Sequence, residues 1–226
     1  MNDWLQFFQR VLPSFLEGTV ITLELTAIGL LMGLVLGLLA ALARVYGSPW
    51  MRRIAVAYIE LFRGTPVLVQ LFLIYYGLPG LGLTLSRFLS ACLAMGLNSG
   101  AYQAEYLRGS IQAVGEGQLM AGRAIGMSRW KAIWFVILPQ ALRLAIPAWS
   151  NEPISLLKTT AVVFLIAVPD LMTRAKEAAV RTYDPIAAYL AVAVVYLAMV
   201  FLLDQFLKYL ERRSRLPGFE METKTA

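Results

Sequence analysis

Long apolar runs separated by short polar segments dominate the pattern of the 226-residue chain. The clearest run extends from Leu25 to Ala43 and contains no charged residue. About 20 apolar residues in a helix cross the hydrocarbon core of a membrane, so this run predicts a transmembrane helix. Four further runs follow. The pattern predicts an all-α integral membrane protein with five transmembrane spans, at residues 19–43, 54–79, 86–107, 140–168 and 184–208.

The first span carries Gly29, Gly33 and Gly37, one glycine every four residues. At this spacing the glycines lie on one face of a helix, where the missing side chains let a second helix approach closely. We interpret this face as a tight packing surface and assign no ligand to it.

Ionisable residues lie near the membrane region in two close pairs. Glu60 and Arg63 are three residues apart, and so are Glu105 and Arg108. This spacing places both members on one helix face, where they can form an ion pair. We therefore expect structural pairs, with substrate contact as the alternative for the first pair and gating as the alternative for the second.

The fourth span is interrupted by Asn151-Glu152-Pro153 and by Lys158. Pro153 offers no backbone N–H and breaks a helix, and transporters place substrates at broken helices near the membrane midplane. A carboxylate there would bind the cation of a basic amino acid, so Glu152 is the first substrate-binding candidate. The alternative is a structural ion pair with Lys158 or Arg143; Lys158 is also a candidate for contact with a substrate carboxylate.

Composition and charge narrow the class of protein. The chain is 59% hydrophobic and only 15% charged, which favours lipid as its main solvent. The net charge of +6 fits basic membrane loops better than a nucleic-acid surface, because the basic residues lie between apolar runs. With no histidine and one cysteine, Cys92, the chain lacks the residues for Ser-His catalysis, ordinary zinc sites or an internal disulfide. We expect Cys92 to serve packing.

Loop charges predict the orientation. With the N-terminus outside, 12 of the 20 Lys and Arg residues fall in inner loops and the tail, and 5 fall in outer segments. Positive charge favours the cytoplasmic side, so we expect residues 1–17 to be periplasmic, residues 18–209 to form the transmembrane domain and residues 210–226 to be cytoplasmic. The first residues lack a basic stretch, so we expect no cleaved signal peptide.

The segment from residue 114 to 139, between the third and fourth spans, predicts two short helices joined by a tight turn. Gly126 stands where a helix-ending glycine is expected, and Ser128 is a candidate N-cap. The second helix then presents one apolar stripe, made of Trp130, Ile133, Trp134 and Ile137. Pro139 is expected to end or kink this helix. From the residues alone, an amphipathic hairpin lying at the membrane interface is an equal alternative to a docking surface for a partner.

This segment resembles the EAA loop of ABC importer permeases. The loop pattern is Glu-Ala-Ala, three residues, Gly, nine residues, Ile, one residue and Leu-Pro, and the matching positions are Ala121, Gly126, Leu138 and Pro139. Met120 replaces the usual Glu, Gly122 the second Ala and Val136 the Ile. The resemblance implies that the hairpin docks on a cytoplasmic ATPase subunit, through Met120, Ala121, Gly122, Gly126, Trp130, Leu138 and Pro139.

Further motifs are similar to polar amino acid permeases of the same importer class. They are Phe62-Arg63-Gly64-Thr65-Pro66, the stretch Gly100 to Ile111, Leu138 to Arg143 and Asn151 to Lys158. Thr159-Thr160-Ala161-Val162 and Val168-Pro169-Asp170-Leu171 resemble the branch that handles histidine, lysine, arginine, ornithine and opines. The resemblance implies the type I ABC importer permease fold, with Asn98 and Thr159 beside Glu152 and Lys158 in the substrate site.

The expected function is transport of polar, and more narrowly basic, amino acids across the bacterial inner membrane by alternating access. The expected partners are a second permease subunit (identical or paralogous), an ATPase dimer, a periplasmic binding protein and lipid, with no nucleic acid. The chain contains no Gly-Lys pair and hence no P-loop, so ATP and Mg²⁺ are expected on the ATPase and no cofactor or metal on this non-enzymatic chain. The alternatives are an importer of another amino acid or opine, a secondary transporter and a non-transporting membrane scaffold.

Overall fold

The computed structural model describes residues 2–214, with side chains from residue 11 onward. Residues 215–226, which include most of the predicted tail with Arg215 and Lys224, lie outside this range. Every element in the described part of the chain is helical. The α-helices are α1 (Asn2–Tyr46), α2 (Pro49–Gly64), α3 (Val67–Phe72), α4 (Arg87–Val114), α5 (Glu116–Ala124), α6 (Arg129–Ala132), α7 (Leu138–Trp149), α8 (Asn151–Thr159), α9 (Leu171–Thr182) and α10 (Pro185–Ser214). Two π-helical segments, η1 (Leu73–Gly77) and η3 (Ile133–Ile137), and two 3₁₀ segments, η2 (Leu78–Leu81) and η4 (Thr160–Ile166), complete the chain.

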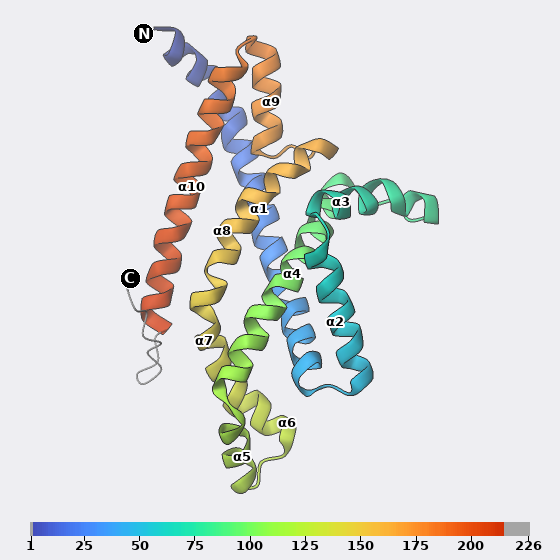
Figure 1. Cartoon of the computed structure of the whole chain (residues 1–226). Helices are drawn as coiled ribbons and strands as arrows, with labels where there is room; N and C mark the ends of the chain where they lie inside the picture. The colour runs from blue at the N-terminus through green and yellow to red at the C-terminus, as the bar shows by residue number, and fades with distance from the viewer. Residues whose placement is uncertain (1, 215–226) are drawn as a thin grey trace.

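The helices run up and down one long axis (Figure 1). α1 descends from the end near the N-terminus, α2 returns beside it, and α4 descends again to the α5–α6 hairpin. α7 and α8 ascend from the hairpin, and α10 descends last. The five predicted spans correspond to α1, α2 with α3, α4, α7 with α8, and α10.

Helix lengths differ from the predicted spans. α1 is 45 residues long, or about 68 Å at 1.5 Å per residue, so it extends far beyond a hydrocarbon core of about 30 Å. By length and apolarity alone, three helices in the described residues can cross a membrane: α1, the helix Arg129–Trp149 and α10. Two bent helix pairs raise the number to as many as five if each pair is one span. They are α2 with α3 to η2, and α8 to η4 with α9. α4 is not in this group. The polar side chains of α4 lower its hydropathy. α4 packs against α1, α2 and α7, so many of these side chains face other helices instead of lipid.

The glycine face of the first span packs as predicted. A Cβ atom at Gly37 would lie 2.9 Å from the backbone nitrogen of Ala104 in α4, and one at Gly29 would lie 3.2 Å from the Met95 side chain. The glycines thus bring the α1 and α4 backbones together. Close backbone approach replaces large side chains as the source of packing between these helices.

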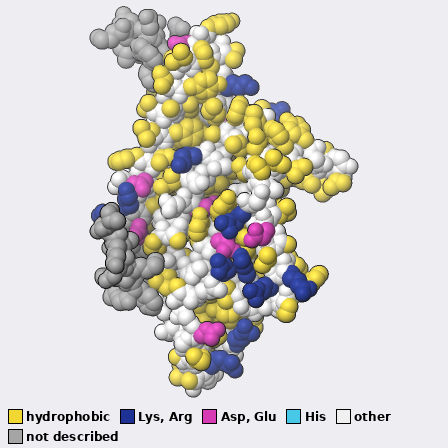
Figure 2. All heavy atoms as spheres, in the orientation of Figure 1, with side chains coloured by type: hydrophobic (Ala, Val, Ile, Leu, Met, Phe, Trp, Pro, Cys, Tyr) yellow, Lys and Arg dark blue, Asp and Glu magenta, His cyan; other side chains and the backbone are white. Residues whose placement is uncertain are grey.

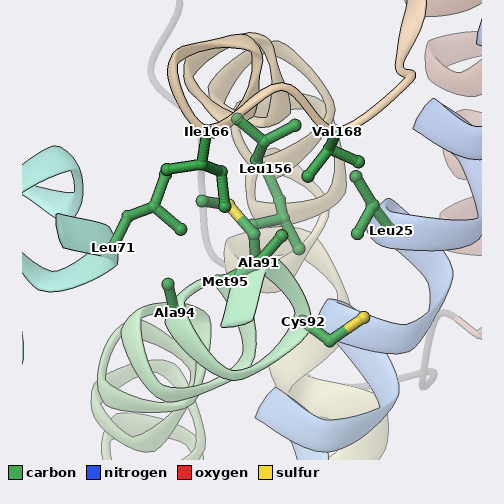
Figure 3. Close-up of a cluster of buried hydrophobic side chains, with 10 residues drawn as sticks. Leu25, Leu71, Ala91, Cys92, Ala94, Met95, Leu156, Ile166 and Val168 are labelled. Carbon is green, nitrogen blue, oxygen red and sulfur yellow. The ribbon is translucent and has the colours of Figure 1, made fainter. Parts of the chain in front are cut away.

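The largest apolar cluster lies where α1, α3, α4 and α8 meet (Figure 3). Leu25, Leu71, Met95 and Leu156 come from these four helices and are buried. Cys92 belongs to the same cluster, which confirms the prediction that it serves packing. The cluster therefore joins the bent segments α2–α3 and α8–η4–α9 to the central helix α4.

Of the two outcomes expected at Pro139, an end or a kink of the helix, the structure excludes the end. Pro139 does not end the helix, because α6, η3 and α7 form one continuous helix from Arg129 to Trp149. A five-residue π-helical segment, Ile133–Ile137, precedes the proline. The wider turn accommodates a residue that has no N–H for the α-helical pattern. The helix that contains the start of the fourth predicted span therefore begins inside the hairpin, at Arg129.

The surface divides by chemistry (Figure 2). Hydrophobic side chains cover the upper part of the face shown, whereas Lys and Arg gather over the lower part, where α2, α4 and the α5–α6 hairpin lie. α10 exposes large apolar side chains along much of its length, among them Leu190, Val194, Leu197 and Phe201. Such exposure suits contact with lipid.

Candidate functional site

A sharp bend between α2 and α3 forms one wall of a polar cavity. The two helices meet at 105°, at the break Thr65-Pro66. Thr65 is extended because a residue before proline disfavours the helical conformation. The Gln70 side chain closes the bend by donating to the carbonyl oxygens of Phe62 (2.8 Å) and Thr65 (3.0 Å).

The cavity has a volume of about 460 Å³, a size that fits a small molecule. α2, α3, α4 and α8 supply its walls. The lining residues are Arg63, Gly64, Thr65, Pro66, Val67, Asn98, Tyr102, Tyr106, Glu152, Ser155, Leu156 and Thr159. Three of the four predicted substrate-binding residues, Asn98, Glu152 and Thr159, are therefore brought together by the fold.

Glu152 lies in the first turn of α8 and is only 5% exposed. Its Oε1 accepts a hydrogen bond of 2.6 Å from the Ser99 hydroxyl of α4. Within the described residues it makes no ion pair, so the alternative of a structural pair with Lys158 or Arg143 does not hold. Pro153 was predicted to break the helix, but it lies in the first turn of α8. The interruption between α7 and α8 is the single residue Ser150, whose backbone stays in the helical region.

Lys158 is not a cavity residue. Its side chain is exposed and does not line the cavity, although the residue lies in the same helix as Glu152. Positions 152 and 158 are six residues apart and therefore point to different sides of α8. Its proposed contact with a substrate carboxylate in this cavity is thus contradicted by the geometry.

Arg63 takes a different role from the predicted one. The expected Glu60–Arg63 ion pair is absent from the described structure, and Glu60 is exposed. The Arg63 guanidinium instead lies 5.3 Å from the centre of the Tyr102 ring, at the cavity. The sequence carried a signal for this position, since Arg63 immediately precedes the helix-breaking Gly64-Thr65-Pro66.

Asn98 and Thr159 contact the cavity while bonding to the protein. Asn98 donates to the Phe62 carbonyl (3.0 Å) and to the Gln70 side chain (3.1 Å), which ties α4 to the bend. The Thr159 hydroxyl donates to the carbonyl of Ser155 (2.8 Å). Tyr102, Tyr106 and Ser155 complete the wall; sequence reasoning did not assign them, because only the bend places them opposite Arg63.

The ion pair predicted between Glu105 and Arg108 is present. Arg108 donates to Glu105 Oε2 through Nε (3.1 Å) and Nη2 (2.8 Å). Arg44 of α1 binds the other oxygen of the same carboxylate. Glu105 thus joins α1 to α4 just above the hairpin, a contact across helices that the spacing of three residues did not predict.

The hairpin has the predicted turn chemistry. Gly126 has φ +88°, a conformation that favours glycine, and its N–H donates to the Arg123 carbonyl (3.0 Å). The Ser128 side chain caps α6 by accepting from the Lys131 N–H. Gly122 is buried against Ala132, where a Cβ atom would lie 3.1 Å from the Ala132 side chain.

The apolar stripe of the hairpin divides between two environments. Ile133 and Ile137 are buried against the body of the protein, whereas Trp130 and Trp134 are half exposed. The other predicted docking residues differ in the same way. Met120, Ala121, Gly126 and Pro139 are exposed, and Gly122 and Leu138 are buried. Met120 (65%) and Ile125 (77%) leave an apolar tip uncovered.

The all-helical membrane domain, with its polar cavity and its exposed hairpin at one end, has the fold of type I ABC importer permeases. The chain belongs to the family of binding-protein-dependent transport system inner membrane components, whose model matches residues 33–216. It is 38% identical over 216 residues to the glutamine transport system permease protein GlnP of Escherichia coli (strain K12), covering 95% of this chain and 98% of the relative. It is 41% identical over 206 residues to the L-cystine transport system permease protein TcyB of Bacillus subtilis (strain 168), covering 91% and 88%.

Solved structures agree with this assignment. The crystal structure of an amino acid ABC transporter with histidines is 38% identical, with a TM-score of 0.83 over 91% of this chain and 96% of that chain. The inward-facing MetNI methionine ABC transporter has a TM-score of 0.72 at 19% identity and shares the fold. The chain is therefore the multi-pass permease subunit of an amino acid ABC importer and not an enzyme, since a separate subunit hydrolyses ATP. Family membership implies an ATPase and a substrate-binding protein as partners.

Proposed function

We propose that this permease imports amino acids with a cationic side chain and binds them in the cavity around Glu152. The observation that carries the proposal is a buried carboxylate that lines a small-molecule cavity without a cationic partner among the described residues. An isolated charge away from water is costly unless a partner compensates it. A cationic side chain of the substrate supplies that partner.

Other lining residues suit the rest of an amino acid. The Arg63 guanidinium offers a cation to the α-carboxylate, and such pairs form charge-assisted hydrogen bonds. Asn98 and Thr159 line the same cavity and offer side-chain oxygens as acceptors. The site thus presents opposite charges, from α2 and from α8, to a zwitterion that carries one extra positive charge.

A neutral polar amino acid is the second candidate. The relatives named above are a glutamine and an L-cystine permease, while the solved relative was crystallised with histidines. Glutamine would place an amide near Glu152 and leave the carboxylate uncompensated. An opine carries further carboxylates, which the single guanidinium of Arg63 would have to bind.

The hairpin supports the proposed mechanism. In it, the α5–α6 hairpin docks on the cytoplasmic ATPase dimer, which binds ATP and Mg²⁺, and a periplasmic binding protein delivers the substrate. Exposed Met120, Ile125 and Trp130 provide an apolar contact surface, and Met120 stands at the glutamate position of the EAA pattern. A second permease subunit, identical or paralogous, completes the pathway, and the domain alternates between inward-open and outward-open states. A scaffold would need no buried charge in a cavity.

The test is Glu152→Gln in proteoliposomes that contain the permease pair, the ATPase and the binding protein. We expect the KM for arginine to rise by about tenfold or more, the loss of one charge-assisted hydrogen bond, while glutamine uptake changes little. Glu24→Gln is the matched control, since Glu24 is exposed on α1 away from the cavity. Unchanged arginine uptake and unchanged preference would overturn the substrate proposal. Uptake that needs neither ATP nor binding protein would contradict the importer mechanism.

A further inference from the structure

A row of three hydrogen bonds leads from Trp149 to Glu152. The Trp149 indole N–H donates to Gln103 Oε1 (2.8 Å), and Gln103 Nε2 donates to the Ser99 hydroxyl (3.0 Å). The Ser99 hydroxyl then donates to Glu152 Oε1 (2.6 Å). Every bond points its donor toward the carboxylate, so the dipoles of the row reinforce one another and favour negative charge on Glu152.

The row lies in the protein interior. Ser99 and Gln103 are fully buried, one turn apart on α4. Gln103 Nε2 also donates to the Leu30 carbonyl of α1 (3.1 Å), which fixes the amide. Gly33 leaves the room for this arrangement, because a Cβ atom there would lie 2.5 Å from Gln103 Nε2 and 3.0 Å from Ser99 Oγ.

The two oxygens of Glu152 are used differently. Oε1 receives the Ser99 hydroxyl, whereas Oε2 makes no hydrogen bond or ion pair within the described part of the chain. The side chain lines the cavity. The row therefore holds the carboxylate by one oxygen and leaves the other for a ligand.

We propose that Ser99, Gln103 and Trp149 are positioning residues that orient the Glu152 carboxylate and maintain its charge, and thereby set the preference for cationic over neutral amino acids. The inference rests on the proposed role of Glu152 in substrate binding. None of the three lines the cavity, so they act through Glu152 alone. Because Gln103 is fixed by α1 and Trp149 ends α7, the site depends on the packing of two helices beyond its own walls.

The test measures equilibrium binding of radiolabelled arginine and glutamine to the purified complex of this chain with its partner permease and ATPase. Ser99→Ala removes the last donor and Trp149→Phe removes the first. We expect Ser99→Ala to weaken arginine binding about tenfold and Trp149→Phe about threefold, with glutamine binding little changed. The ratio of the two affinities is the decisive value, since general damage to the fold weakens both.

Matched controls are available for both changes. Ser90 is also buried on α4, but its hydroxyl bonds only to the Ser86 carbonyl, so Ser90→Ala should keep the ratio. Trp50 is 67% exposed at the start of α2, so Trp50→Phe should do the same. Glu152→Gln is the reference. If Glu152→Gln lowers the ratio of arginine affinity to glutamine affinity while Ser99→Ala and Trp149→Phe do not, the positioning role is overturned and the proposed function stands. If Glu152→Gln itself leaves the ratio unchanged, both are overturned.

Discussion

Single polar side chains decide where helices begin in this protein, and Asp170 is the most buried example. Its carboxylate accepts from the N–H groups of Thr173 (3.0 Å) and Met172 (3.3 Å) and so caps α9. The Thr22 hydroxyl of α1 accepts from the next free N–H, that of Leu171 (3.1 Å). Three of the first N–H groups of α9 are thus satisfied away from water.

We predict that Asp170→Ala destabilises the protein by about 1–2 kcal/mol, the cost of a lost N-cap. For a domain of this size that corresponds to roughly 2–8 °C in the midpoint of thermal unfolding, measured in detergent. Asp170→Asn keeps one of the two acceptor oxygens and should therefore lose less stability than Asp170→Ala. Equal losses in both variants would show that the charge, and not the cap, stabilises this position.

At this scale, short-range chemistry was predictable and long-range contact was not. Gly126, Ser128 and the Glu105–Arg108 pair followed from spacing along one helix or turn. Arg63 and Lys158 did not: Arg63 lies against Tyr102 of another helix, and Lys158 is exposed on a side of α8 away from Glu152. Tyr102 reaches Arg63 across the cavity, and no sequence pattern relates the two positions.

At the scale of elements, the contact between α1 and α4 depends on the absence of side chains. We predict that Gly37→Ala destabilises the protein by about 1–3 kcal/mol, since a Cβ atom would meet the Ala104 nitrogen at 2.9 Å and the Gly100 oxygen at 3.0 Å. Backbone atoms cannot give way as a flexible side chain can. The measurement is the midpoint of thermal unfolding in detergent.

Gly109 provides the control for this substitution. It lies in α4, and a Cβ atom there would meet nothing within 4 Å. Gly109→Ala should leave stability unchanged or raise it by up to about 1 kcal/mol, as expected for alanine in a helix. A Gly37→Ala variant as stable as Gly109→Ala would contradict the close-packing interpretation.

The hairpin is the element whose geometry should govern coupling. Gly126→Pro forces φ from +88° to about −65° and removes the N–H that bonds to Arg123. We predict that ATP hydrolysis continues while arginine uptake falls by about tenfold or more. A misplaced hairpin that costs about 1.4 kcal/mol of docking free energy already gives a factor of ten. The measurement is ATP hydrolysed per amino acid transported in proteoliposomes.

Gly117→Pro is the matched control, since Gly117 lies in the first turn of α5, where an N–H has no helical partner. Its coupling ratio should match wild type. A wild-type ratio in Gly126→Pro would count against docking of the hairpin on the ATPase. It would favour the alternative of an amphipathic hairpin that rests at the membrane interface.

At the scale of the whole molecule, the apolar runs predicted the helical passes and their order. Their bends escaped prediction. The 105° turn at Thr65-Pro66 and the 52° turn between η4 and α9 arise from a proline and from a left-handed Ala167, whose effects depend on neighbouring helices. The cavity exists only because the first bend places Arg63 opposite α8. Its residues could be named singly from sequence, but their assembly required the fold.

The charge asymmetry of the molecule predicts its orientation in the membrane, and this prediction can be tested with introduced cysteines. Lys and Arg gather at the end that carries the hairpin (Figure 2), so we predict that this end is cytoplasmic. Cys92 is 5% exposed in the core and should give little background labelling. Gln118→Cys in the hairpin and Arg181→Cys in α9 place exposed thiols at opposite ends. In right-side-out spheroplasts, a membrane-impermeant maleimide should label the second variant at once and the first only after permeabilisation. The reverse pattern would invert the topology and move the hairpin away from any cytoplasmic ATPase.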